Sequence, residues 1–325
     1  MSGVLPQLAC ASMSQNNTSI IYAGLDIHKA SLQLHLTARN YELPNTPAGH
    51  RKLLALITPH PNLQLICEAS GGYERQVVAA FHTANIPVTV LNPAQVRHFA
   101  RALGQRAKTD PLDAQLLSRC GEALKPAPTL PQTPEQQQLV ELTRYRLQLL
   151  EKLIAERQQA EMIAHPVLRR QSASLVRRLE ADLAKIDTLL AKLRNASTEL
   201  ASKARRLTEI KGVGDQTALS LLAEMPELGT LNRRQAASLA GLAPHPRQSG
   251  QWTGKASISG GRNQVRRALY MAALTACRLH PTLSQFYRRL RSCGKPAKVA
   301  ITAVMRKLLV LLNFALKNPQ IPLAS

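Results

Sequence analysis

The chain has 325 residues, of which 45% are hydrophobic, and its 42 Lys and Arg greatly outnumber its 20 Asp and Glu. This length and apolar content predict two or three folded domains with a substantial core, and they exclude a disordered basic tail. The formal net charge of +22 indicates a polyanionic partner, with nucleic acid as the first choice. A basic structural protein is the alternative that the composition leaves open.

The basic residues dominate the second half of the chain. No Asp or Glu occurs in the 98 residues after Glu227, whereas Lys and Arg occur there sixteen times. Because a solvated surface usually carries both signs of charge, this part of the chain is predicted to face phosphates. Any metal site built from carboxylates must therefore lie nearer the N-terminus.

The five cysteines are widely separated, with no CxxC pair and no zinc-like spacing to histidine, so they are predicted to be reduced thiols of a cytoplasmic protein. No unbroken apolar run reaches the about 18 residues of a membrane helix, and no membrane partner is expected. Residues 1–18 lack the basic start and long apolar segment of a signal peptide and are interpreted as a flexible leader.

The apolar pattern of residues 19–125 alternates between strand and helix periods. The stretch SLQLHLTA, for example, places a leucine at every second position, as in a half-exposed strand. A hairpin followed by strand, helix and strand predicts a mixed α/β sheet with helices on its faces. The predicted strands cover residues 19–27, 31–38, 63–69 and 86–93, and the predicted helices cover residues 73–85 and 93–104.

Four acidic side chains stand at the ends of these elements. Asp26 and Glu68 each end a predicted strand, and the pair Asp110 and Asp113 begins a helix. Strand ends meet at one edge of an α/β sheet, and residues three apart in a helix share a face, so the four are predicted to converge. Converging carboxylates stay ionised only beside cations. Mg²⁺, or alternatively Mn²⁺, takes oxygen ligands and accepts phosphate oxygens, which suits cleavage of a phosphodiester.

A purely structural role for the same acids is the alternative. Asp110 precedes Pro111 and suits the N-cap of a helix whose first position is proline. Asp113 would then interact favourably with the helix dipole, and Asp26 would only terminate its strand. Capping and metal binding are compatible roles for Asp110.

Residues 125–134 carry four prolines and are predicted to form the linker that ends a first domain, residues 19–125. The next segment, residues 126–204, has helical periodicity, and His165–Pro166 is predicted to divide it into two antiparallel helices. A short coiled-coil seam and an ordinary helical hairpin both suit its apolar positions, and an exposed seam would make the protein at least a dimer. These positions are Leu179, Leu183, Ile186, Leu190, Leu193 and Leu200.

Residues 205–325 are predicted to form a compact, basic, helical domain. Its first part, LTEIKGVGDQTALSLLAEM, has the apolar-x-Gly-apolar-Gly turn of a helix–hairpin–helix. Lys211, Gly212 and Gly214 in this turn are predicted to contact a nucleic-acid backbone, because glycines let backbone N–H groups approach a phosphate. A plain turn between two helices is the alternative.

The order of a strand-end Asp, a strand-end Glu and an Asp-x-x-Asp helix start resembles the ribonuclease-H-like fold of Holliday-junction resolvases. A more specific resemblance is carried by GLDIHK, CEASGGYE, LNPAQVRHFARALGQRAKTDPLDAQLL and, far downstream, ASLAGLAPHPRQSGQWTGKASISGGRNQVRRALYMAAL. Together these segments resemble the DEDD transposases of the insertion-sequence one-hundred-and-ten family, to which the Piv-type DNA invertases are related. They occur in the family's order and span about residues 20 to 315.

The resemblance implies a resolvase-like N-terminal domain, a coiled-coil segment and a C-terminal transposase domain with a catalytic serine. The position that matches this serine is Ser249 of RQSG, which would attack the DNA phosphate. Without the resemblance Ser249 would be interpreted as a turn residue, and Ser257 and Ser259 would suit equally. The metal-binding catalytic acids implied by the likeness are Asp26, Glu68, Asp110 and Asp113.

Basic side chains near the serine are candidates for phosphate contacts. Arg266 and Arg267 have an alternative role as the solvated face of a helix. Trp252 is the only tryptophan of the chain, and anchoring its loop suits it better than stacking on a base. The candidate phosphate ligands are Lys255, Arg262, Arg266 and Arg267.

The resemblance also implies the partners of the protein. These are double-stranded DNA of the element ends and target, a structured noncoding guide RNA called the bridge RNA, and further copies of the chain in a dimer or tetramer. The acids of one protomer would meet the serine of another, and the active protein would associate with the nucleoid. The low aromatic content of 3% fits a protein that recognises backbone shape while RNA supplies the sequence.

Two other functions remain as alternatives. One is a metal-dependent junction resolvase or nuclease whose serine is structural, and the other is a nonenzymatic DNA-binding protein whose acids are helix caps. All hypotheses in which the protein binds nucleic-acid phosphates predict an affinity for nucleic acid that falls steeply as the salt concentration rises.

Overall fold

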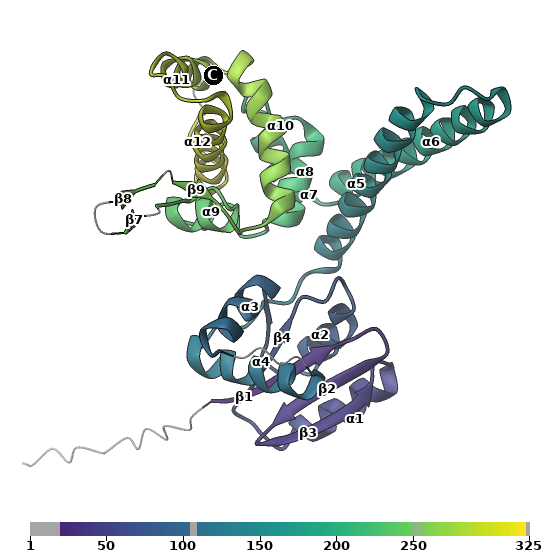
Figure 1. The fold of residues 1–325 in the computed structure, drawn as a ribbon, viewed down its shortest axis with the longest axis vertical. Coiled ribbons are helices and arrows are strands. Elements are labelled where there is room, and N and C mark those ends of the chain that lie inside the picture. Colours follow the sequence, from purple (N-terminus) through teal and green to yellow (C-terminus); the bar gives the residue numbers. More distant parts are fainter. Residues whose placement is uncertain (1–19, 105–108, 247, 250–251, 255, 323–325) are drawn as a thin grey trace, which may run out of the picture. The chain divides into compact units, whose positions relative to one another are not determined.

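The computed structural model divides into two compact units, Met1–Pro131 and Gln132–Ser325 (Figure 1). The predicted leader, residues 1–18, lies outside the described residues. The boundary falls inside the proline-rich segment that the sequence marks as a linker, and residues 132–204 belong to the same unit as residues 205–325. The structure describes residues 20–104, 109–246, 248–249, 252–254 and 256–322.

The first unit is built on a five-stranded mixed sheet with the strand order β3-β2-β1-β4-β5. β1 pairs antiparallel with β2 and parallel with β4, and β4 pairs parallel with β5. The predicted mixed α/β sheet is therefore confirmed. The strands are β1 (Ile21–Ile27), β2 (Ser31–Leu36), β3 (Arg39–Pro44), β4 (Leu63–Glu68) and β5 (Val88–Leu91).

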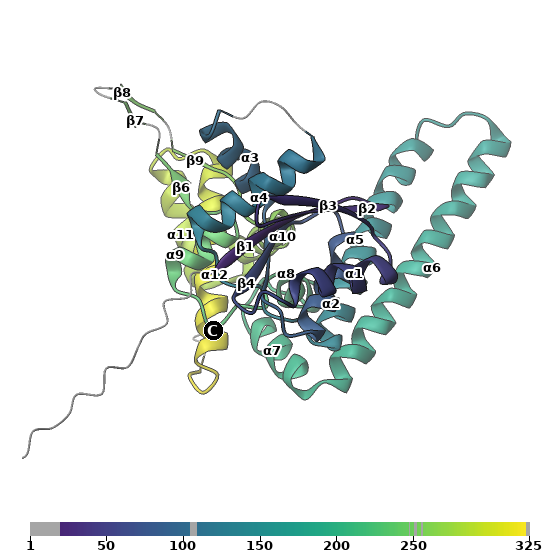
Figure 2. The same cartoon turned by 90° about the horizontal axis from the view of Figure 1, so that it is seen from below.

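Helices cover both faces of this sheet (Figures 1 and 2). On one face, α1 (Pro47–Ile57) and α2 (Glu74–Thr83) bury Leu53 and Phe81 against the leucines of β1 and β2. On the other face, α3 (Pro93–Ala102) and α4 (Asp110–Leu124) pack Leu117 of α4 against Tyr22 and Ile66. Residues of opposite parity along β1 thus serve two different cores, which fixes the face that each strand-end side chain occupies.

The sequence did not predict β3 and α1. β2 and β3 are joined by a tight turn in which Thr37 and Ala38 both have positive φ, 45° and 66°. Gly and Asn are the residues that normally signal such a turn, so its sequence carries no hairpin signature. β3 pairs with the whole of β2, which makes the N-terminal hairpin a three-stranded meander.

The proline-rich segment begins as part of the first unit. The Thr129 backbone N–H donates to the Val88 carbonyl (2.8 Å), and the Val90 N–H donates to Thr129 Oγ1 (3.0 Å). The Gln64 side-chain amide donates to the Pro126 carbonyl (2.7 Å). The segment therefore covers the outer edge of β5 before the chain leaves the unit.

The second unit starts with a helical hairpin of α5 (Pro134–Ala160) and α6 (Pro166–Ala196). His165–Pro166 begins the second helix, as predicted, because proline fits the first position of a helix. Leu183 packs against α5, and Leu190 is fully enclosed in the core of the unit. Apolar residues of the predicted seam thus pack against other residues of the same unit, and this favours the helical-hairpin alternative.

The rest of the second unit is a helical bundle with a ribbon of short strands beside it (Figure 1). Its helices are α7 (Thr198–Thr208), α8 (Asp215–Glu224), α9 (Arg233–Leu239), α10 (Asn263–Leu279), α11 (Pro281–Ser292) and α12 (Ala297–Lys317). Its strands are β6 (Pro244–His245), β7 (Gln248–Ser249), β8 (Trp252–Thr253) and β9 (Ser257–Ile258).

α12 is long and apolar enough to cross a membrane by length and composition alone, with a mean hydropathy of 1.9. Half of the most apolar stretch of α12 is buried in the unit, where Leu308 and Leu312 are fully enclosed. Arg306 and Lys307 interrupt the apolar run, so a search for unbroken runs does not find it. Burial in the core accounts for the apolar character of this helix.

Candidate functional site

Two of the predicted acids end neighbouring parallel strands. Leu25 of β1 is aligned with Cys67 of β4, so Asp26 and Glu68 are the next residues along the two strands. Ile66, two residues before Glu68, faces the α3 and α4 side of the sheet, and alternation assigns Glu68 to the same side. Asp26 is 7% exposed, and its Oδ1 accepts the backbone N–H of Ile27 (3.0 Å).

α4 approaches β1 unusually closely, and this contact brings the third acid to the first. A Cβ atom at Gly24 would lie 1.9 Å from the Ala114 carbonyl oxygen, and a Cβ atom at Gly121 would lie 2.7 Å from Tyr22 and Ile66. The Ser118 hydroxyl donates to the Tyr22 carbonyl (2.7 Å) across the same contact. With α4 held in this way, the start of the helix lies at the end of β1.

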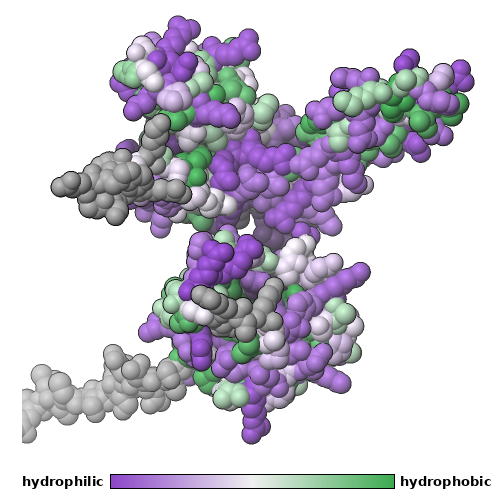
Figure 3. Space-filling model, viewed as in Figure 1, coloured by the Kyte–Doolittle hydropathy of each residue, from purple (hydrophilic) through white to green (hydrophobic). Residues whose placement is uncertain are grey.

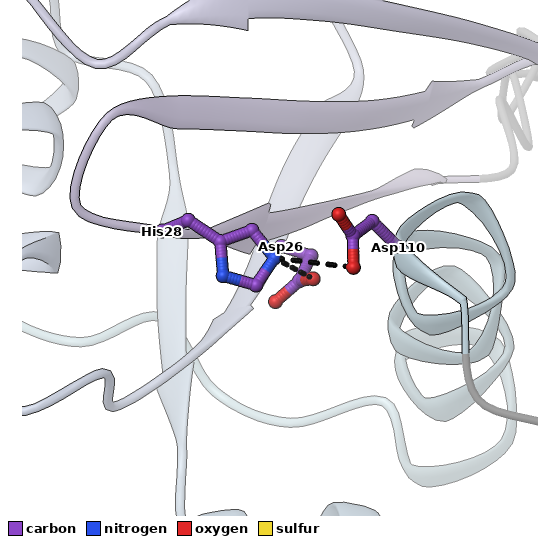
Figure 4. A group of neighbouring side chains, drawn as sticks. All are labelled: Asp26, His28 and Asp110. Carbon is purple, nitrogen blue, oxygen red and sulfur yellow. Dashed lines mark ion pairs between the residues drawn. The ribbon is translucent and has the colours of Figure 1, made fainter.

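Asp26 and Asp110 meet at this point together with His28, which the sequence did not single out (Figure 4). The Nε2 atom of His28 lies 3.1 Å from Asp26 Oδ2 and 3.4 Å from Asp110 Oδ1. One potential ligand atom from each of the three residues lies within 4.8 Å of the others. The signal that would have found His28 is its spacing of two from Asp26, which on an extended strand means the same face.

The alternative in which Asp110 is the N-cap of the helix is wrong by one residue. Thr109 occupies the N-cap, since its carbonyl accepts the Asp113 N–H (2.9 Å), and Asp110 is the first residue of α4. Asp110 is exposed and directed to His28 rather than to the free N–H groups of its own helix. Asp113 lies in the same first helical turn and is half-buried, and both acids have a favourable place at the positive end of the helix dipole.

The loop after Glu68 is organised by Glu74, a residue to which the sequence pattern assigned no role. The Glu74 carboxylate accepts the backbone N–H of Ser70 (3.1 Å), the Ser70 hydroxyl (3.0 Å) and the backbone N–H of Gly72 (2.8 Å). Burial alone would favour the neutral acid, but these donors hold the Glu74 pKa below its ordinary value. Gly71 and Gly72 have positive φ, which allows the tight turn.

The residues at this sheet edge fit a divalent cation. Asp26 and Asp110 provide carboxylate oxygens that converge on one point, and Glu68 and Asp113 stand on the adjoining strand end and the same helical turn. Oxygen donors of this kind are those that Mg²⁺ and Mn²⁺ bind. Converging carboxylates repel one another unless a cation neutralises them.

Ser249 lies in a ribbon of short strands in the second unit. β6 pairs with β9, and inside this pair β7 pairs with β8, where Ser249 is aligned with Trp252. β7 and β8 project away from the helices in both views (Figures 1 and 2). Lys255, a predicted phosphate ligand in the same ribbon, lies outside the described residues.

The base of this ribbon is a close contact of glycines. A Cβ atom at Gly241 would lie 2.1 Å from the Gly260 carbonyl oxygen, and one at Gly261 would lie 2.1 Å from the Gly241 nitrogen. Arg266 Nη1 donates to the same Gly260 carbonyl (2.6 Å). Arg266, predicted as a phosphate ligand, therefore also has a structural role at the base of the ribbon that carries Ser249.

Two other predicted phosphate ligands are engaged with carboxylates. The Arg262 guanidinium binds Glu227 through two hydrogen bonds of 2.7 Å, and this contact raises the Arg262 pKa. Arg267 Nη1 lies 2.5 Å from Glu151 Oε1. Glu227 is the last acid of the chain, and its pairing partner lies 35 residues further on, too far for a sequence pattern to reveal.

The predicted nucleic-acid turn joins α7 and α8. Gly212 has a φ of 105° and lies against α10, where a Cβ atom would come within 2.7 Å of the Ala276 nitrogen. Lys211 and Gly214 are exposed, and Gly214 is the N-cap of α8. Asp215 follows in the first turn of α8 and pairs with Arg194 (2.9 Å).

A basic surface without a counterpart among the predicted phosphate ligands lies on α11, the loop that follows it and the first half of α12. Arg289 and Lys307 both lie over the ring of Phe286, at 5.4 and 4.6 Å from its centroid. Within the described residues, none of the cations of this surface forms an ion pair with a carboxylate. We define the α11–α12 basic surface as the exposed residues Arg288, Arg289, Arg291, Lys295, Lys298 and Lys307.

Comparison with known proteins identifies two transposase regions in the chain. Residues 23–163 match a DEDD transposase model, and residues 204–288 match the model described as transposase IS116/IS110/IS902 family. The pilin gene-inverting proteins of Moraxella bovis and Moraxella lacunata are each 31% identical to the chain over 302 residues, which cover 89% of this chain and 94% of theirs. The chain belongs to this family of transposases.

An uncharacterized 43.6 kDa protein of insertion element IS110 from Streptomyces coelicolor is 32% identical over 127 residues, 38% of the transposase and 31% of that protein. The predicted family is thereby confirmed. The matched DEDD region includes the five-stranded sheet except for the first two residues of β1, and the ribonuclease-H-like class predicted for the first unit agrees with it. As a transposase, the protein is an enzyme of DNA recombination and acts on DNA.

Proposed function

We propose that this transposase cleaves and exchanges DNA strands of an insertion element by metal-dependent phosphoryl transfer, with Ser249 as the nucleophile and a structured noncoding RNA as the guide. The observation that carries the proposal is the convergence of Asp26 and Asp110 at the end of β1, with Glu68 next in register. Helix capping does not explain this convergence, because Asp110 is directed to His28 and not to its own helix.

The four acids are proposed to hold Mg²⁺ or Mn²⁺ at this sheet edge. A bound cation would withdraw charge from a DNA phosphate and stabilise the negative charge that develops on its oxygens. The chain's own contribution is to fix the donors. The hydrogen bond from Ile27 N–H orients Asp26, and the close packing of α4 on β1 sets the position of Asp110.

Ser249 is proposed to replace one DNA oxygen at phosphorus. The protein would then be linked to one DNA end through phosphoserine, and the other end would be released as a free hydroxyl that can attack in the reverse sense during strand exchange. The closely packed glycines at the base of the ribbon, together with Arg266, support a fixed position for this strand pair. The proposal of Ser249 rests on the family resemblance of the segment around RQSG.

Phosphate binding is proposed for the turn at Lys211 and for the α11–α12 basic surface. Two cations that share the ring of Phe286 repel each other, and within the described residues no carboxylate offsets this repulsion. A polyanionic backbone would offset it and release counterions on binding. Guidance by RNA is supported by the low aromatic content, since the chain offers few rings for reading unpaired bases.

A homo-oligomer, from dimer to tetramer, is proposed on the same family resemblance. Apolar side chains are exposed toward the free end of the α5–α6 hairpin, where hydrophobic residues reach the surface (Figure 3). Met162 is 88% exposed, and Ile154, Val167, Leu168 and Leu175 are also exposed. Burial of such side chains between protomers would add to the stability of an assembly.

Cleavage of DNA that carries the element ends tests the proposal. Asp110→Asn is expected to reduce metal-dependent cleavage at least about a hundredfold, because it removes one charged donor. Glu122→Gln, which changes an exposed acid at the other end of α4, is the matched control and should cleave like the unmodified protein. Equal activity of the two variants would contradict a metal role for Asp110.

The serine is tested separately by trapping the protein on DNA. Ser249→Ala is expected to abolish a covalent adduct that survives denaturation. Ser257→Ala, which changes an exposed serine of β9 in the same ribbon, should retain the adduct. Cleavage without any adduct in the unmodified protein would instead favour a resolvase-like nuclease.

A further inference from the structure

His28 stands at the proposed cation site without being one of its four acids. Its Nε2 atom is 3.1 Å from Asp26 Oδ2 and 3.4 Å from Asp110 Oδ1 (Figure 4). Adjacent donors around a six-coordinate cation with bonds of about 2.1 Å are about 3 Å apart. The two nitrogen-to-oxygen distances are compatible with neighbouring ligands of one ion, and the two oxygens lie within 4.8 Å of each other.

The backbone of His28 is held in place by hydrogen bonds that lead through Asn45 to His50. The Asn45 side-chain amide donates to the His28 carbonyl (2.8 Å), and the His28 N–H donates to the Ser31 carbonyl (2.9 Å). Asn45 Oδ1 lies 2.8 Å from His50 Nε2. Because the amide nitrogen of Asn45 serves His28, its oxygen must accept, and His50 Nε2 therefore carries the proton.

His50 completes this support from the interior of the unit. It is 6% exposed on α1, and burial lowers its pKa, which favours the neutral imidazole. Outer partners that hold a ligand-bearing residue in place are common in metal sites, and here they hold the backbone of His28. On the other side of the site, Asp26 Oδ1 is occupied by Ile27 N–H, which leaves Oδ2 directed to His28.

We propose that His28 Nε2 is a ligand of the same cation as Asp26 and Asp110, positioned by Asn45 and His50. The inference rests on the proposed function, since it assumes a divalent cation at this sheet edge. Imidazole nitrogen is a good ligand for transition-metal ions, whereas Mg²⁺ is bound almost entirely through oxygen. His28 therefore gives the site a preference for Mn²⁺ over Mg²⁺ that four carboxylates alone would not provide.

The experiment uses the full-length protein with Mn²⁺ and reads the nitrogen directly by electron spin echo envelope modulation. The unmodified protein is expected to show ¹⁴N modulation from an imidazole, and His28→Ala is expected to lose it. The same variant should bind Mn²⁺ about tenfold more weakly, while Mg²⁺ affinity, measured by competition, changes by less than about threefold. His60→Ala, which removes a histidine that forms no contact with the site among the described residues, is the control.

Two further variants separate coordination from folding and from positioning. His28→Gln keeps a polar side chain at a position that is about half exposed, so its fold is retained, and it too should lose the ¹⁴N signal. Asn45→Ala should keep the signal but weaken Mn²⁺ binding, because the ligand is less firmly held.

The outcomes distinguish this inference from the proposed function. Mn²⁺ bound with an oxygen-only signature in the unmodified protein, or equal weakening of both cations in His28→Ala, overturns the ligand role and leaves the metal-dependent mechanism standing. Asp26→Asn is the variant expected to lose Mn²⁺ binding. If the unmodified protein binds Mn²⁺ no better than Asp26→Asn, both the ligand role of His28 and the metal-dependent mechanism are overturned.

Discussion

Gly24 of β1 and Ala114 of α4 lie so close that a Cβ atom on Gly24 would come within 1.9 Å of the Ala114 carbonyl oxygen. No side chain fits between strand and helix at this level. The contact sits two residues before Asp26 on the same face of β1 and one helical turn after Asp110, so it determines how far apart these two acids are.

Substitution of Gly24 tests this dependence. Gly24→Ala is expected to push α4 away from β1, to destabilise the first unit by about 2 to 3 kcal/mol and to weaken Mn²⁺ binding, because overpacking at a backbone contact cannot be relieved by a side-chain rotation. Gly104→Ala provides the comparison, since Gly104 has a φ of 69° and a Cβ atom there would meet no atom of the described residues within 4 Å, so its cost of about 1 kcal/mol reports mainly backbone strain. Thermal unfolding and metal titration of both variants would decide; a milder effect at position 24 than at position 104 would refute the packing argument.

The ion pair of Arg262 and Glu227 is expected to stabilise the second unit. Arg262→Ala should lower the free energy of unfolding by about 1 to 2 kcal/mol, since it leaves a half-buried carboxylate without its two charged hydrogen bonds. Arg234→Ala removes an exposed arginine of α9 that has no ion pair among the described residues and should be neutral. Denaturant unfolding of the two variants is the measurement.

The same pair makes stability depend on pH in a defined direction. Although burial opposes ionisation, hydrogen bonds from Arg262 hold the pKa of Glu227 below its ordinary value of 4.5. The contribution is therefore complete above pH 4.5 and is lost as the pH falls through the lower pKa of the folded state. Unfolding followed from pH 7 to pH 3.5 should show a loss that Glu227→Gln largely removes; an identical pH profile in that variant would contradict the assignment.

Neutralising the α11–α12 basic surface is expected to weaken nucleic-acid binding without affecting the fold. In a variant with Arg288→Gln, Arg291→Gln and Lys295→Gln, the slope of log affinity against log salt should fall by about 0.9 for each phosphate of duplex DNA that the protein no longer neutralises. Lys185→Gln, an exposed cation of α6 that already pairs with Asp182, is the matched control. Binding titrations at several salt concentrations, with duplex DNA and structured RNA in parallel, would show which polyanion uses this surface, and unchanged slopes for both would exclude it.

Mixing of two inactive variants tests the proposed oligomer. Asp110→Asn and Ser249→Ala proteins are expected to restore part of strand exchange when combined, because the family resemblance implies that acids and serine act from different protomers. Each protein alone should remain inactive. Recombination of a reporter plasmid measures the effect, and failure of mixed protein to exceed the separate ones would argue for a site formed within one chain.

Most of the sheet could be predicted because its strands are short apolar runs bounded by turn residues. β1, β2, β4 and β5 follow the predicted segments to within a few residues. β3 was missed because the turn at Thr37 and Ala38 uses residues that rarely adopt positive φ. A local pattern cannot reveal a turn whose conformation is imposed by the pairing of the strands on either side.

The site was predictable where geometry follows from period and register, and unpredictable where it depends on distant partners. Asp26 and Asp110 were expected to meet, and the structure brings them together. His28 was not expected, although its spacing from Asp26 carries the signal. The pairing of Arg262 with Glu227 could not be read from the sequence, because the two residues are joined only by tertiary packing.

The proline-rich segment has a consequence for where the first unit can be separated from the rest. By pairing with Val88 and Val90, Thr129 shields the last strand of the sheet from any other strand that could add to it. A fragment that stops at Lys125 would expose the edge of β5 and is expected to self-associate through it. A fragment that continues to Pro131 would keep this edge covered.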